Sequence, residues 1–186
     1  MIDATGWLST ARRIESPNAD ERPADTPISL IVIHAISLPP EQFGSDDIIR
    51  LFTNRLDPNA HPYFANISKL RVSAHFLIRR DGELIQFVAC QRRAWHAGQS
   101  TWRGRSRCND FSLGIELEGS DTQCFEAIQY RRLNELLALL RHNYPVEDVV
   151  GHSDIAPGRK TDPGPHFDWQ IVETPASKTR QMPGTS

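Results

Sequence analysis

The sequence contains only three cysteines, Cys90, Cys108 and Cys124, among 186 residues. Their number is odd and their spacings are unrelated, which argues against a disulfide framework. The same spacings argue against a metal site built mainly from cysteine, because such sites use closely spaced cysteine pairs. A chain without disulfides fits a reducing compartment.

Long apolar runs and an excess of charge of one sign are also missing. No apolar stretch approaches the roughly 20 residues that span a bilayer, and the formal net charge is only -2. This balance gives no overall attraction to nucleic acid or to an anionic membrane, and no Gly-rich phosphate loop appears. The opening residues show no basic leader followed by an apolar run. We therefore expect a cytoplasmic protein with no nucleic-acid or membrane partner.

The length and composition set the expected domain organisation. A chain of 186 residues with 39% hydrophobic and 24% charged residues suits one well-buried domain and is short for two. We expect that domain to cover residues 1–174 and to be monomeric. Residues 16–27 mix Pro, Asn, Asp and Arg without periodicity, which predicts an irregular N-terminal arm. Residues 175–186 have too little apolar content to pack, which predicts a mobile tail.

Two strand patterns carry candidate functional residues. The apolar run Ser29–His34 is typical of a buried strand and places a histidine at its end. In Phe111–Glu118, Leu and Ile alternate with Gly and Glu, so the apolar side chains and the carboxylates point to opposite faces. Glu116 is therefore expected to point away from the apolar face of its strand.

Other elements are predicted from turn chemistry and helical periodicity. Asp81 and Gly82 between two β-prone runs predict a hairpin. Apolar residues recur at helical spacing over residues 126–143, which predicts an amphipathic helix packed on a sheet. Ser45 is expected to cap a short helix that runs to about Phe52.

Residues 151–164, GHSDIAPGRKTDPG, are rich in Gly and Pro, which predicts an irregular loop. Loops that hold His, Lys and Asp together often carry chemistry, and His152 and Asp162 could be brought side by side when the loop folds back. His34 is the best third member, because catalytic zinc takes three protein ligands and keeps a fourth position open. The spacing alone also fits a core histidine, a surface histidine and a turn aspartate, so it leaves both interpretations open.

Further segments establish a resemblance over nearly the full chain. They are ISLPP from Ile36, LDPNAHPYF from Leu56, LRVSAHFLIRRDGE from Leu70, RAWHAG from Arg93, CNDFSLGIELEG from Cys108, and the opening stretch. In this order and spacing, they resemble the zinc N-acetylmuramoyl-L-alanine amidases, a family that includes phage lysozyme-type amidases and peptidoglycan recognition proteins. The similarity is greatest to the cytosolic branch of that family, which acts on anhydro-muropeptides.

The resemblance implies a single α/β domain with a mixed central β-sheet flanked by helices. It also implies one Zn²⁺ per chain, held by His34, His152 and Asp162, with Glu116 and Lys160 serving the reaction. That reaction is hydrolysis of the amide bond between (1,6-anhydro-)N-acetylmuramic acid and the L-alanine of muropeptides, in peptidoglycan recycling. Close relatives usually have Asn after the first zinc histidine, where this chain has Ala35, so any polar contact from that side chain is missing.

The two reaction residues also have ordinary structural interpretations. Glu116 suits a general base, although an isolated glutamate on a polar strand face is usually a solvated carboxylate, which is what we expect of Glu118. Lys160 lies two residues before Asp162 and could stabilise a developing oxyanion. On its own it could equally be an exposed loop lysine, as we expect of Arg159.

The acidic peptide of a muropeptide calls for cations away from the metal. Arg71 and Arg107 are the candidates for substrate binding, because a guanidinium pairs bidentately with a carboxylate. Arg103 and Arg105 are expected to form a solvated loop surface. Trp95 could provide an apolar wall for the sugar or peptide, or could belong to the core.

Two further histidines and two rival functions remain to be placed. His75, within an apolar strand, is expected to be a hydrogen-bonded core histidine, and His96 could border the cleft.

One rival function is a module that binds muropeptide without cutting it. The other is an extracytoplasmic wall amidase of the same fold.

Overall fold

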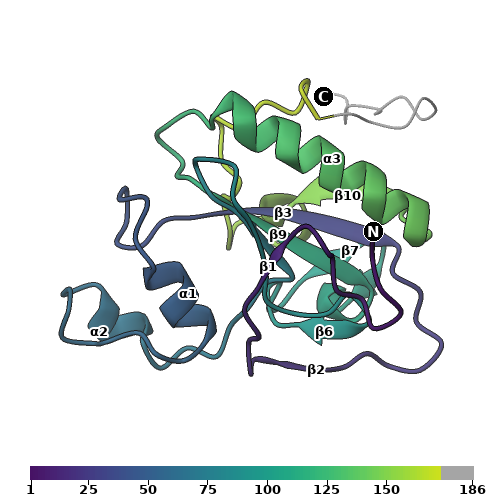
Figure 1. The fold of residues 1–186 in the computed structure, drawn as a ribbon, viewed down its shortest axis with the longest axis horizontal. Coiled ribbons are helices and arrows are strands. Elements are labelled where there is room, and N and C mark those ends of the chain that lie inside the picture. Colours follow the sequence, from purple (N-terminus) through teal and green to yellow (C-terminus); the bar gives the residue numbers. More distant parts are fainter. Residues whose placement is uncertain (173–186) are drawn as a thin grey trace.

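The structure, a computed structural model, describes residues 1–172, so the predicted tail lies outside the described residues. Its centre is a six-stranded sheet, with β4 and β5 antiparallel and all other neighbouring strands parallel (Figure 1). In spatial order the strands are β1 (Arg12–Arg13), β5 (Leu84–Gln86), β4 (Phe76–Ile78), β9 (Ser112–Glu118), β3 (Leu30–Ile36) and β10 (Asp148–Gly151). The expectation of a mixed sheet is confirmed.

Helices and two small antiparallel sheets surround this central sheet. The helices are α1 (Asp47–Phe52), α2 (Phe64–Ile67), the 3₁₀ helix η1 (Cys108–Asp110), α3 (Ala127–Asn143) and α4 (His152–Ile155). The small sheets pair β2 (Ala19–Glu21) with β6 (Arg92–Ala94), and β7 (Thr101–Trp102) with β8 (Arg105–Ser106). Among residues 1–172, no helix is both long and apolar enough to cross a membrane.

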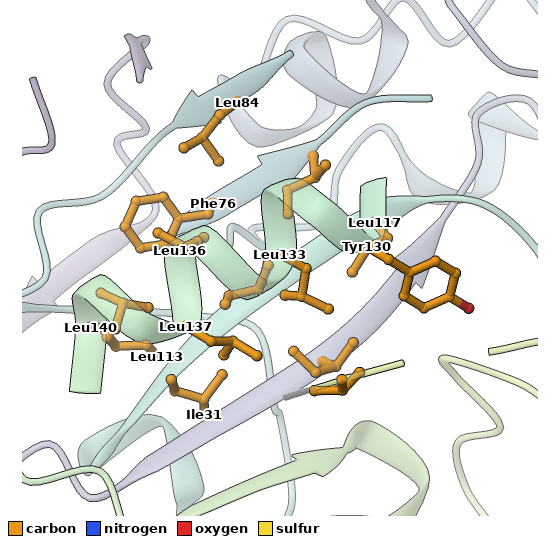
Figure 2. Packing of buried hydrophobic residues seen from close by; sticks show 14 of the residues in the cluster. Ile31, Phe76, Leu84, Leu113, Leu117, Tyr130, Leu133, Leu136, Leu137 and Leu140 are labelled. Atoms are coloured by element: carbon orange, nitrogen blue, oxygen red, sulfur yellow. The ribbon is translucent and has the colours of Figure 1, made fainter. Parts of the chain in front are cut away.

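Helix α3 covers one face of the sheet, as its apolar periodicity predicts. It begins with a capping box between Glu126 and Gln129, which satisfies backbone N–H groups of its first turn. Its buried side chains meet those of β3, β4 and β9, and Figure 2 shows how they interdigitate. The labelled members of this cluster are Ile31, Phe76, Leu84, Leu113, Leu117, Tyr130, Leu133, Leu136, Leu137 and Leu140.

The opposite face of the sheet supports both α1 and the functional site. Ile48 and Phe52 of α1 belong to a second apolar cluster with Leu77 and Ile85, so α1 and α3 lie on opposite sides of the sheet (Figure 1). Because strand side chains alternate between faces, β3 presents residues 31 and 33 to α3 and residues 30, 32 and 34 to the other side.

The predicted hairpin is confirmed. Strands β4 and β5 are antiparallel, with Ile78 opposite Leu84. Gly82, in the connection between them, has φ +85°, a backbone conformation that glycine adopts without a steric penalty.

Three predictions of local structure were wrong in part. The N-terminal arm is not irregular throughout, because residues 19–21 form β2 against β6. His152 does not lie in irregular loop but opens the single helical turn α4, where the Gly151 N–H donates to Asp154 Oδ2 at 2.7 Å. Asp46, not Ser45, is the N-cap position of α1, although the Ser45 hydroxyl still accepts the Asp47 N–H at 3.1 Å.

Candidate metal centre and active site

Three parallel strands bring the functional side chains to one edge of the sheet. His34 of β3 lies in register with Glu116 of β9, and His152 follows directly on β10. Because paired residues of neighbouring strands point to the same face, His34 and Glu116 share the face opposite α3. Leu113 and Leu117 pack on the α3 side, so the predicted orientation of Glu116 is confirmed.

The segment after α4 folds back and places Asp162 beside His152. The Ser153 backbone N–H donates to the Asp162 carbonyl at 2.9 Å. The Thr161 hydroxyl donates to Asp121 Oδ2 at 2.6 Å, which ties the same segment to the loop after β9. These two contacts fix the carboxylate of Asp162 close to both imidazoles.

The three predicted metal ligands form a compact triangle. His34 Nδ1 lies 3.0 Å from His152 Nδ1 and 3.1 Å from Asp162 Oδ2, and His152 Nδ1 lies 3.0 Å from that same carboxylate oxygen. Their side chains are 2%, 4% and 17% exposed. Three atoms that each carry a lone pair thus converge in a space largely shielded from water.

This donor set fits a zinc ion. His152 Nε2 lies 3.1 Å from the Ala97 carbonyl, and a carbonyl can only accept, so Nε2 carries the ring proton and a neutral ring has a lone pair at Nδ1. The contact between that lone pair and Asp162 Oδ2 then needs a cation between them. Ligands about 2.0–2.1 Å from a tetrahedral zinc lie roughly 3.4 Å apart, close to the observed separations, and imidazole and carboxylate are ligands that zinc accepts.

Electrostatics favour the protonation states that bind metal. Burial lowers the pKa of His34 to about 4, against the opposing effect of Asp162, so the imidazole is neutral at pH 7. Burial alone would raise the pKa of Asp162, but its contacts with His152 and His34 hold that pKa well below its usual range. A neutral His34 imidazole and an ionised Asp162 carboxylate therefore face one another.

Glu116 is buried beside this triangle with unused hydrogen-bonding capacity. Its Oε2 has no hydrogen-bond partner among the described residues. Burial, reinforced by the charge of Asp162, raises the pKa of Glu116 well above its ordinary value, while Lys160 acts in the opposite direction. A carboxyl group held in this way is suited to exchanging protons.

The remaining predicted site residues have distinct environments. Lys160 is exposed, and its charge acts on both Glu116 and His34. Arg71 is exposed in the loop before β4. The Arg107 side chain is 70% exposed and its Nε lies 3.2 Å from Asp110 Oδ2. Trp95 is half-buried, and its indole N–H donates to Asp20 Oδ1 at 3.1 Å, which places this residue against β2.

One charged residue differs from expectation, and a second matches it. Glu118 is not a solvated carboxylate: it is 1% exposed and accepts the backbone N–H groups of Gly44 at 2.6 Å and Arg80 at 3.1 Å. Arg159 is exposed, as expected, and it also donates to the carbonyls of Ala97 at 2.8 Å and Gln99 at 2.6 Å, so its guanidinium anchors a loop.

Sequence reasoning left several supporting residues without a role. His75 is a buried core histidine, as predicted, with Nδ1 accepting the Gly114 N–H at 3.0 Å. His96, by contrast, contacts a predicted metal ligand, since its Nδ1 lies 2.9 Å from His34 Nε2. Asn109 and Ser112 contact the His96 segment in turn. Their segments, RAWHAG and CNDFS, stood out in the sequence, but no spacing rule connects residues this far apart.

Comparison with known proteins agrees with this geometry. The family profile described as N-acetylmuramoyl-L-alanine amidase matches residues 24–165. The chain is 56% identical to the 1,6-anhydro-N-acetylmuramyl-L-alanine amidase AmpD of Citrobacter freundii over 182 residues, covering 95% of this chain and 97% of the relative.

Solved structures show the same similarity. A crystal structure of a selenomethionine AmpD derivative superposes with a TM-score of 0.90 at 56% identity, covering 92% of this chain and 97% of the other. The amidase AmiD of E. coli, in complex with the substrate anhydro-N-acetylmuramic acid-L-Ala-D-γ-Glu-L-Lys, superposes with a TM-score of 0.58 at 31% identity, covering 92% of this chain and 63% of AmiD.

Proposed function

This chain belongs to the N-acetylmuramoyl-L-alanine amidase family, and from that membership we propose that it uses one Zn²⁺, held by His34, His152 and Asp162. It is a hydrolase that cleaves the amide bond between 1,6-anhydro-N-acetylmuramic acid and the L-alanine of muropeptides. The observation that carries the zinc proposal is the triangle of lone-pair atoms 3.0–3.1 Å apart.

Zinc, when bound, supplies Lewis acidity that activates water and polarises a carbonyl. The protein must then provide a base, a cation for the developing oxyanion and residues that bind the substrate. Glu116 is the proposed base: it takes a proton from the water that attacks the amide carbon and passes that proton to the leaving amine of L-alanine. Its Oε2, which has no hydrogen-bond partner among residues 1–172, leaves an acceptor for that proton.

Lys160 is the proposed oxyanion partner. Attack converts the amide carbonyl into a tetrahedral centre with negative charge on oxygen, and a nearby ammonium lowers the energy of that state. The charge of Lys160 acts on both Glu116 and His34, which supports a position at the site. Its exposure leaves it free to follow the substrate.

Three residues are proposed to hold the rest of the muropeptide. Arg71 and Arg107 are exposed cations whose planar guanidinium groups suit the carboxylates of the stem peptide. Trp95 is proposed to offer a ring face, because its N–H is already bound by Asp20 and a sugar or peptide would meet the ring itself.

The cellular setting follows from the substrate class. Anhydro-muropeptides are fragments of the wall, so we propose a role in peptidoglycan recycling, in the cytoplasm and as a monomer. No nucleic-acid or membrane partner is part of this proposal.

Metal analysis of one variant pair tests the ligand assignment. Asp162→Ala removes the only carboxylate ligand and should sharply lower the zinc content of the purified protein, because a three-ligand site loses affinity when one ligand is removed. Asp121→Ala is the matched control: it releases Thr161, the residue next to the proposed ligand, without removing a ligand, and should lower the zinc content far less than Asp162→Ala. Full zinc and full activity in Asp162→Ala would overturn the assignment.

A further inference from the structure

A chain of hydrogen bonds runs from one backbone carbonyl to the proposed metal ligand His34. Ser112 Oγ lies 2.6 Å from the Cys108 carbonyl oxygen and 3.2 Å from His96 Nε2. The other ring nitrogen, His96 Nδ1, lies 2.9 Å from His34 Nε2. None of these contacts belongs to the substrate or to the reacting atoms.

The hydrogen bond from Ser112 to the Cys108 carbonyl decides which atom donates in each of the other hydrogen bonds. The Ser112 hydroxyl has one proton, and the 2.6 Å contact with a carbonyl, which can only accept, requires that proton. Ser112 Oγ must then accept from His96 Nε2–H. A neutral His96 consequently has a lone pair at Nδ1, which accepts from His34 Nε2–H and leaves His34 Nδ1 unprotonated, pointing at His152 and Asp162.

The backbone holds the His96 ring in this position. A Cβ added to Gly114 would lie 2.4 Å from His96 Cγ, so the ring occupies space that only glycine leaves open on the buried strand β9. Asn109 Oδ1 accepts the backbone N–H groups of His96 at 3.2 Å and of Ala97 at 2.8 Å. The ring is thus fixed from the strand below and from η1 beside it.

The same short segment also orients the second histidine ligand. The Ala97 carbonyl accepts from His152 Nε2 at 3.1 Å. Residues 96 and 97 therefore supply the acceptors for the outer ring nitrogens of both His34 and His152. One rigid dipeptide sets the direction in which both inner nitrogens face.

We propose that His96 is a positioning residue for the metal centre, acting through His34, with Ser112 setting its tautomer. The proposal rests on the zinc site proposed above. Acceptors bound to the outer nitrogen of a metal-ligating histidine fix its tautomer and orientation, and their loss typically weakens metal binding by about 10- to 100-fold.

Two substitutions of equal size at position 96 separate hydrogen bonding from packing. In His96→Asn, Oδ1 takes the place of Nδ1 and can still accept from His34. In His96→Leu, a side chain of nearly the same shape has no acceptor. The zinc dissociation constant, measured by competition with a chelator, should rise about 10- to 100-fold in His96→Leu and stay closer to the wild-type value in His96→Asn.

Two buried serines provide a second matched pair. Ser112 and Ser73 are 0% and 1% exposed, and each donates to a carbonyl at 2.6 Å, but Ser73 accepts from the Trp95 backbone N–H and has no bond to the His96 ring. Both alanine variants should lose comparable stability to thermal unfolding. Only Ser112→Ala should weaken zinc binding.

The tautomer of His34 in the metal-free protein is the decisive readout. Long-range ¹H–¹⁵N spectra should show His34 protonated at Nε2 in the wild type and in His96→Asn, and a mixture of tautomers in His96→Leu. The proposal would be overturned if His34 in folded His96→Leu were purely the Nε2–H tautomer and the zinc affinity were unchanged. Equal losses of zinc affinity in His96→Leu and His96→Asn would also overturn it. If the wild-type protein bound no zinc, the proposed function would fail, whereas these spectra would still decide the role of His96.

Discussion

Glu116 carries a cost that its proposed role as the base would explain. A buried carboxylate oxygen without a partner is destabilising by about 1–3 kcal/mol or more, and Glu116 Oε2 is such an atom among the described residues. Glu118, two residues further along the same strand and on the same face, instead accepts two backbone N–H groups. The contrast supports the proposal that Glu118 is structural and that Glu116 is available for proton transfer.

Replacing Glu116 by Gln keeps the shape of the side chain and removes the base. We expect kcat to fall roughly 10²- to 10⁴-fold, the usual contribution of general acid-base catalysis, with zinc content unchanged. Glu118→Gln is the control and should affect stability more than turnover. Zinc content and kcat should be measured on the same preparation, because lost zinc would make Glu116 a ligand, and near-normal turnover would assign the base to another group.

Arg107 is expected to act on the peptide rather than on the scissile bond. Arg107→Ala should lower kcat/KM roughly 30-fold for a substrate with the full acidic stem. This factor corresponds to a loss of about 2 kcal/mol of transition-state stabilisation. A substrate that carries L-alanine alone should be little affected. Arg103→Ala, whose guanidinium pairs with Asp148 Oδ1 at 2.8 Å, serves as the control. Equal losses on the two substrates would rule out recognition of the stem carboxylates.

Among the elements, β2 has a charged clamp that ties the N-terminal arm to the domain. Asp20 accepts from Arg93 Nε at 2.7 Å and Nη2 at 2.6 Å, and from the Trp95 indole N–H. The hydrogen bonds from Arg93 lower the pKa of Asp20 from 3.8 to about 2. Arg93 and Trp95, which bind Asp20, lie three residues and one residue before His96. Strands β2 and β6 therefore border one side of the site.

The clamp makes part of the stability of the fold dependent on pH. Because the pKa of Asp20 is lower in the folded state, its contribution is present above about pH 4 and is lost as the pH falls toward about 2. Asp20→Asn should therefore lower the free energy of unfolding at pH 7 on the order of 1 kcal/mol, allowing for solvent screening of a side chain that is 41% exposed.

Urea unfolding of wild type and Asp20→Asn at several pH values checks this prediction. The difference between the two proteins should shrink as the pH is lowered from about 4 toward 2. Asp57→Asn, at an exposed loop position, should show little difference at any pH. A difference for Asp20→Asn that stayed constant across this range would show that the carboxylate charge contributes nothing.

The elements that sequence predicted well are those with long apolar patterns. Strands β3 and β9 and helix α3 each have enough periodic residues to define a buried face, which also fixed the direction of Glu116. Strands β1 and β2 have two and three residues, mostly charged, and carry no such pattern. They form because distant segments supply their partners, a tertiary effect that local patterns do not encode.

The same distinction applies to the site. His34, His152 and Asp162 could be singled out by residue type and by resemblance, but the spacing alone left their role open. The roles of His96, Asn109 and Ser112 depend on contacts between β3, the segment after β6, η1 and β9. Such contacts become visible only when the sheet order is known.

For the whole molecule, the fold assembles the proposed metal centre, which the unfolded chain lacks. The proposed ligands come from positions 34, 152 and 162, and two of them depend on the pairing of β3 with β10. An ion that binds the folded chain and not the unfolded chain adds to stability by RT ln(1 + [L]/Kd). In this proposal, metal binding, folding and amide hydrolysis depend on the same arrangement of strands.

Zinc titration of the metal-free enzyme tests this account most directly. Protein stripped by a chelator is mixed with increasing Zn²⁺ and with an anhydro-muropeptide that carries a tripeptide stem, and the products are identified by mass spectrometry. We expect release of anhydro-N-acetylmuramic acid and the free peptide to rise in proportion to zinc and to reach a plateau at one ion per chain. Full cleavage by the metal-free protein, or no cleavage with the site filled, would contradict the account.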